Sequence, residues 1–82
     1  MEKYLVEVCF PAAEQKYDVF IPAAAMLHEV LTMLVAMAPD LSGGRYTPGA
    51  DAVLCSDSGE ILDINMTVDA LGIRNGSQLM LI

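Results

Sequence analysis

Hydrophobic and polar residues alternate in two stretches near the start of the chain, from Tyr4 to Phe10 and from Lys16 to Ile21. Alternation with a period of two is typical of β-strands that bury only one face. The residues between the stretches, from Pro11 to Gln15, have the composition of a turn. Pro22 ends the second stretch, because proline lacks the N–H group that a strand ladder uses. The pattern predicts an opening β-hairpin.

A helical pattern follows from Ala24 to Ala38, and Pro39 and Asp40 predict its end. Its apolar residues recur at spacings of three and four and fall on one stripe. This stripe comprises Leu27, Val30, Leu31, Leu34 and Ala38. Three methionines lie beside the stripe rather than at its centre: Met26, Met33 and Met37. Because methionine adapts its shape to different neighbours, their position favours a role at a binding surface.

The second half of the chain carries weaker strand signals separated by turns. Residues from Leu41 to Asp51 include glycines and a proline and are predicted to form a loop. A strand is predicted from Ala52 to Ser56, a short one at Ile61-Leu62, and a last one from Gln78 to Ile82. A turn at Asn75-Gly76, with Gly76 at positive φ, is predicted to lead into the last strand. The order β-β-α-β-β-β places strands on both sides of one helix. It indicates an α+β fold in one domain, residues 1–82.

The charge of the chain restricts its partners. Eleven acidic residues against four basic ones give a net charge of −7, which repels nucleic acid and anionic lipid. The most apolar stretch, from Val19 to Pro39, is interrupted by a proline, a histidine and a glutamate, so we expect no insertion into a membrane. The first residues, Met1-Glu2-Lys3, do not begin an apolar signal segment, which favours a cytoplasmic location.

Neither a cofactor nor an enzymatic activity is predicted. Cys9 and Cys55 are too few for a disulfide framework or a four-thiolate metal site. His28 is the only histidine, and neither metal binding nor catalysis is expected of it without partners. Hydrophobic residues make up 55% of the chain, which is high for so short a sequence and predicts apolar surface that meets a partner. The composition therefore favours a protein-binding module.

The order of elements and the positions of the turns resemble ubiquitin over nearly the whole chain. Within the ubiquitin-like proteins, the chain is most similar to the YukD/EsaB family of type VII secretion loci in Gram-positive bacteria. The match is carried by Tyr17-Asp-Val-Phe-Ile21, by Leu27, Val30 and Leu31, and by Gly72-Ile-x-Asn-Gly-x-x-Leu-x-Leu81. The resemblance implies a ubiquitin-like β-grasp fold, in which a mixed sheet packs on one helix.

The chain ends on Leu81-Ile82, without the terminal Gly-Gly through which ubiquitin and the sulfur carriers react. We therefore expect a non-conjugating adaptor or accessory protein of a type VII secretion system. Its expected partner is another protein, either a membrane component of the secretion apparatus or a second copy of the chain. The alternative is a sulfur-carrier or protein-modifier protein of the same fold, which the missing Gly-Gly disfavours.

The candidate binding site lies on the sheet face that points away from the helix. If Val8 and Leu79 face the helix, alternation places several apolar side chains on the opposite face, where polar residues are usual. These candidates are Leu5, Phe20, Leu54, Met80 and Ile82. They are expected to form one patch across neighbouring strands, with Glu7 and Asp18 on its rim. The resemblance agrees, because ubiquitin's main recognition patch lies on this face.

Overall fold

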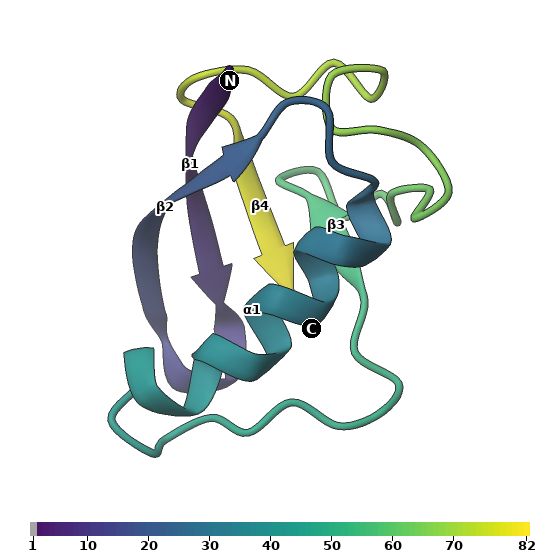
Figure 1. The fold of residues 1–82 in the computed structure, drawn as a ribbon. Helices are drawn as coiled ribbons and strands as arrows, with labels where there is room; N and C mark the ends of the chain where they lie inside the picture. Colours follow the sequence, from purple (N-terminus) through teal and green to yellow (C-terminus); the bar gives the residue numbers. More distant parts are fainter. Residues whose placement is uncertain (1) are drawn as a thin grey trace.

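The computed structural model describes residues 2–82, which form one mixed sheet with one α-helix packed across it. The strands are β1 (Lys3–Phe10), β2 (Gln15–Pro22), β3 (Leu54–Ser56) and β4 (Gln78–Leu81), and the helices are α1 (Leu27–Leu41) and the short 3-10 helix η1 (Pro11–Ala13). The strand order is β2-β1-β4-β3 (Figure 1). β1 runs parallel to β4 and antiparallel to β2, and β3 runs antiparallel to β4. Within the described residues, no helix is long and apolar enough to cross a membrane.

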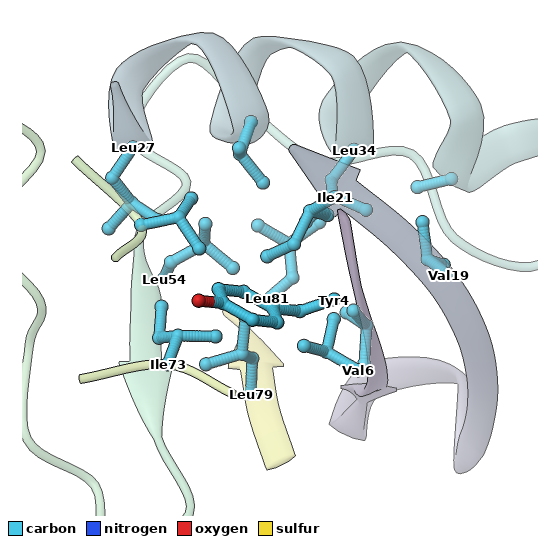
Figure 2. Close-up of a cluster of buried hydrophobic side chains, with 14 of the residues drawn as sticks. Tyr4, Val6, Val19, Ile21, Leu27, Leu34, Leu54, Ile73, Leu79 and Leu81 are labelled. Atoms are coloured by element: carbon cyan, nitrogen blue, oxygen red, sulfur yellow. The ribbon is translucent and has the colours of Figure 1, made fainter. Parts of the chain in front are cut away.

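The hydrophobic core lies between α1 and one face of the sheet, and the predicted alternation of the strands is confirmed. The buried residues of β1, β4 and α1 are Tyr4, Val6, Val8, Phe10, Leu79, Leu81, Leu27, Val30, Leu34 and Ala38. Figure 2 shows Leu27 and Leu34 of the helix facing Leu79 and Leu81 of the last strand. Leu31, the remaining member of the predicted helical stripe, is only half-buried and packs at the side of the core.

The helix begins at Leu27 rather than at Ala24, because the alanines before it bond to a distant part of the chain. The carbonyls of Ala23 and Ala25 accept the N–H groups of Asp69 and Val68, both at 2.9 Å. The N–H groups of the first two helical residues donate to carbonyls in the 64–66 segment. These long-range bonds satisfy main-chain groups that a longer helix would otherwise use.

Pro39 does not end the helix as predicted, since α1 continues to Leu41. Proline has no N–H group and therefore removes one hydrogen bond from a helix. Main-chain bonds made by the residues after Pro39 offset this loss in the last turn. The Pro39 carbonyl accepts the N–H of Gly44 at 2.7 Å, and the Ser42 N–H donates to the Ala38 carbonyl at 3.0 Å. Gly44 has a φ of +85°, a left-handed conformation that glycine adopts without strain. The helix therefore ends after Pro39, where Gly44 turns the chain back and bonds to the last turn.

The short strand predicted at Ile61-Leu62 is reduced to a single bridge between Ile61 and Cys55. Shortly after the bridge the chain turns toward the start of α1, and the Asp63 side chain stabilises this turn by accepting the N–H of Asn65 at 2.9 Å. The turn leaves room for only one paired residue. The predicted fourth strand is therefore reduced to one bridged residue in the described part of the chain, at the position where the sequence predicted it.

Tyr4 joins the segment before β4 to the first strand. Its hydroxyl donates to Asp69 Oδ1 at 2.7 Å, and the Arg74 guanidinium lies 3.1 Å from the same oxygen and 5.5 Å from the centre of the Tyr4 ring. The hydrogen bond to the Asp69 carboxylate raises the pKa of the Tyr4 hydroxyl, because the bond exists only while the proton is present. This contact helps to position the turn that follows.

The predicted turn at Asn75-Gly76 is confirmed. Gly76 has a φ of +88°, a conformation in which a side chain would be strained. The Asn75 side-chain oxygen accepts the N–H of Leu5 at 2.8 Å, and the Leu5 carbonyl accepts the N–H of Gly76 at 2.8 Å. The turn thereby fixes where β4 begins against β1 and sets the register of the last strand.

We expect Gly76→Val to destabilise the protein by about 2–3 kcal/mol, because a β-branched residue is forced into a left-handed conformation. Space is not the cause, since a Cβ at this position meets nothing within 4 Å. Ser77→Val is the matched control and should cost about 1 kcal/mol, for the hydrogen bond that its hydroxyl accepts from the Arg74 N–H. Urea unfolding of both variants measures the difference, and equal losses would contradict the turn assignment.

Candidate protein-binding face

The sheet face opposite α1 carries the odd-numbered side chains of β1 and the even-numbered side chains of β2 and β4. Leu5 and Phe20 are partners across β1 and β2, and they are 37% and 62% exposed. These two residues are called the Leu5–Phe20 pair below. Their exposure agrees with the predicted orientation of both strands.

A second apolar group lies at the end of β4. Met80 pairs with Cys55, and Ile82 forms the next pair with Val53 through two N–H···O bonds of 3.0 Å. Ile61 extends the row as the bridge partner of Cys55. These five residues, Val53, Cys55, Ile61, Met80 and Ile82, are called the C-terminal cluster. Ile61 is 70% and Ile82 is 55% exposed, which makes them its most accessible members.

A polar row crosses the sheet between the two apolar groups. Glu7 pairs with Asp18 of β2 on one side and with Gln78 of β4 on the other. The Lys16 ammonium lies 3.8 Å from the Glu7 carboxylate, so an ion pair spans the same region. The open face therefore consists of two apolar groups with charges between them.

The prediction of a single apolar patch with Glu7 and Asp18 on its rim is wrong. The two acidic residues lie in the middle of the face, and the apolar candidates lie on either side. The cause is the parallel register of β1 and β4, which places Met80 beside Cys9 rather than beside Leu5. Alternation indicates which face a residue occupies, but the position along the sheet depends on the register.

Leu54 does not belong to the open face and is a correction to the predicted site. It is fully buried and pairs with Leu81, whose side chain faces the helix (Figure 2). Its neighbours Val53 and Cys55 point to the open face instead. β3 has only three residues, so alternation alone could not assign its faces.

Three members of the C-terminal cluster were missed by the sequence reasoning: Val53, Cys55 and Ile61. The sequence alone could not place Ile61, because Ile61 and Leu62 are both large aliphatic residues; in the structure Leu62 packs against the core, so Ile61 points the other way. Val53 and Cys55 follow from the same rule once Leu54 is known to be buried. The cluster thus contains more apolar residues than Met80 and Ile82 alone.

The chemistry of the open face is that of a contact surface. A shallow cavity of about 190 Å³ borders the C-terminal cluster and is lined by residues that include Cys9, Lys16 and Met80. Across residues 2–82, no three or more His, Cys, Asp and Glu side chains come close enough to hold a metal ion. His28 is exposed on α1, which lies on the other face of the sheet. Apolar side chains bordered by charges match the composition of protein interfaces.

The strand order, the mixed pairing and the single packed helix define a ubiquitin-like β-grasp fold. Solved structures confirm this class. The chain is similar to the ubiquitin-like domain of the Mycobacterium tuberculosis type VII secretion protein EccD1, with 19% identity, a TM-score of 0.80, and coverage of 100% of this chain and 99% of that one. It is also similar to the ubiquitin-like domain of EccD5 from Mycobacterium xenopi, with 20% identity, a TM-score of 0.74, and coverage of 100% of this chain and 94% of that one. A third similar structure is Caldiarchaeum subterraneum ubiquitin, with 18% identity, a TM-score of 0.77, and coverage of 99% of this chain and 92% of that one.

The family model for the WXG100 protein secretion system (Wss) protein YukD matches residues 5–81. The chain belongs to this family. The resemblance found in the sequence is therefore confirmed, and the protein is a ubiquitin-like domain of a family associated with WXG100, or type VII, secretion. No curated protein matches the chain.

Proposed function

We propose that the protein is a non-conjugating adaptor of a type VII secretion system and that it binds another protein through the open face of its sheet. The observation that carries this proposal is the C-terminal cluster, in which Ile61 and Ile82 leave more than half of their surface in water. Apolar groups of this kind gain free energy when a partner removes them from water. The negative net charge directs the choice of partner toward proteins rather than nucleic acid.

The family and the structural neighbours support the biological context. Two of the similar structures are ubiquitin-like domains of type VII secretion proteins, so a partner within such an apparatus, including one of its membrane components, is the first to test. A cytoplasmic site of action is part of this proposal, and the free thiols Cys9 and Cys55 suit its reducing conditions. They lie on β1 and β3, with β4 between them, so their separation is too large for a disulfide bond.

The test is binding by purified soluble portions of a type VII apparatus from the same organism, measured by isothermal titration calorimetry. We expect Ile61→Asp and Met80→Asp each to weaken binding about tenfold or more, because a charge would be desolvated in an apolar contact. Thr32→Asp, on the exposed side of α1, is the control and should bind like the parent. Equal affinity of all four proteins for every component that binds would refute the open face as the binding surface.

A second copy of the chain is the other candidate partner. Size-exclusion chromatography with light scattering separates the two cases: a dimer that Met80→Asp dissociates would assign the face to self-association. The alternative function, a modifier or sulfur carrier, predicts a covalent adenylate, thiocarboxylate or conjugate. Intact mass spectrometry of the protein after incubation with ATP and cell extract would detect it, and our proposal predicts no change in mass.

A further inference from the structure

The outer edge of β2 is a surface separate from the open face. β2 lies at one end of the strand order β2-β1-β4-β3, and Figure 1 shows it as the outermost strand on its side of the sheet. It is eight residues long, from Gln15 to Pro22. In the part of the chain that the structure describes, β1 is its only strand partner. One edge of β2 is therefore free to pair with a further strand.

The hydrogen bonds of β1 establish which residues of β2 face outward. The Leu5 carbonyl accepts from the Gly76 N–H, and the Glu7 N–H donates to the Ser77 carbonyl, so both of these β1 residues bond toward β4. Main-chain groups of successive residues in a strand point to alternate sides. The even-numbered residues of β1 therefore bond toward β2.

The register then identifies the outward residues. The β2 partners of the even-numbered β1 residues are Gln15, Tyr17, Val19 and Ile21. Their N–H and C=O groups are used by β1. Lys16, Asp18 and Phe20 consequently direct their N–H and C=O groups away from the sheet, and all three residues are exposed. Three main-chain N–H groups and three C=O groups thus lie along the edge, one of each at every second residue, which is the spacing that an added strand requires.

A groove beside this edge provides apolar contacts. A shallow groove of about 140 Å³ lies where the end of β2 meets α1, and it is lined by Pro22, Ala25, Glu29, Val30 and Met33. Met33 is half-buried and packs against the core. Met26 and Met37 lie on the same flank of the helix at spacings of seven and four residues from it, and both are also half-buried. Met33 therefore gives the groove an adaptable apolar wall close to the end of β2.

We propose that the edge of β2 binds an extended segment of a partner protein, which adds as a further strand and places alternate apolar side chains in the groove beside Met33. An extended chain is the one partner that satisfies a row of main-chain donors and acceptors. Every second side chain of such a strand would point to the helix side, next to Tyr17 and Val19, whose own side chains face that way.

Charge selects the kind of segment. Glu29 lines the groove, Asp18 lies on the edge itself, and the net charge of the chain is −7. Lys16, the cation of this strand, lies 3.8 Å from Glu7. The segment therefore carries lysine or arginine beside its alternating aliphatic or aromatic residues. A second copy of this chain fits less well, because both copies would bring the same negative charge.

The first experiment is panning of a phage library of random peptides, about twelve residues long, against the folded protein. We expect enriched sequences with alternating apolar residues and flanking lysine or arginine. Asp18→Pro should weaken binding of the enriched peptide about tenfold or more, because it removes an outward N–H and blocks the edge while leaving the bonds to β1. Asp18→Asn, which removes the same charge but keeps the N–H, is the matched control and should lose much less. A library that enriches no such peptide would overturn the proposal.

The second experiment alters the peptide and needs no variant to fold. The enriched peptide is synthesised with N-methyl groups on its odd-numbered residues and, separately, on its even-numbered residues. Only the set facing β2 should abolish binding, since only those N–H groups join the ladder. Equal effects of the two sets would exclude strand addition.

Three variants distinguish binding in the groove from binding on the open face. Met33→Glu should weaken peptide binding about tenfold, whereas Ala36→Glu, at an exposed helix position, should not. Met80→Asp should leave peptide binding unchanged, because its side chain lies on the open face. If Met80→Asp loses peptide binding and Met33→Glu does not, the peptide binds the open face and the proposed site at the edge of β2 is wrong. The outcome is therefore independent of the proposed adaptor function.

Discussion

Leu79→Asp is expected to leave the protein unfolded at room temperature. Leu79 is 3% exposed and faces α1 among the core side chains (Figure 2). An aspartate there would either stay charged without a partner or give up its charge, and either outcome costs several kcal/mol. The lost leucine adds about 2–5 kcal/mol. Together these approach the whole stability of a small protein, about 5–15 kcal/mol.

Met80→Asp, one residue later, is the matched control and is expected to fold. Its side chain lies on the open face beside Cys9 and Cys55, where a carboxylate can reach water. Circular dichroism melting of both variants measures the contrast. A folded Leu79→Asp together with an unfolded Met80→Asp would mean that β4 is one residue out of register, with the core and the open face exchanged.

Leu34→Ala is expected to lower the free energy of unfolding by about 2–5 kcal/mol. Leu34 is fully buried in the middle of the α1 stripe, and its truncation leaves a cavity that the helix and sheet cannot both close. Leu31→Ala, three residues earlier on the half-buried side of the stripe, should cost at most about half as much. Urea unfolding gives both values. A larger loss for Leu31→Ala than for Leu34→Ala would show that the helix is rotated about its axis.

The long strands show what alternation alone can predict. In β1, β2 and β4 the buried and exposed faces follow the period of two, so Leu5, Phe20, Met80 and Ile82 could be placed on the open face from the sequence. The Asn75-Gly76 turn was also predictable, because few residues other than glycine tolerate a positive φ. These features depend on residues close together in the chain.

The errors arose where distant residues decide the structure or where a strand is too short to show a period. The start of α1 is shifted because Ala23 and Ala25 bond to the 68–69 segment, which no local pattern reveals. Leu54 was assigned to the wrong face because three residues are too few to show a period. The division of the open face by Glu7 depends on the pairing of β1 with β4. Register between strands far apart in sequence is not encoded in the alternation of either strand.

The central pairing of β1 with β4 also has a consequence for how the chain acquires its structure during synthesis. Glu7 and Gln78 are partners although about 70 residues separate them. Until β4 has left the ribosome, β1 can pair only with β2, and a hairpin alone is at best marginally stable in water. Closing so long a loop is also slow compared with forming the helix. We therefore expect the nascent chain to remain accessible to proteases and chaperones until its last strand emerges, and to fold only then.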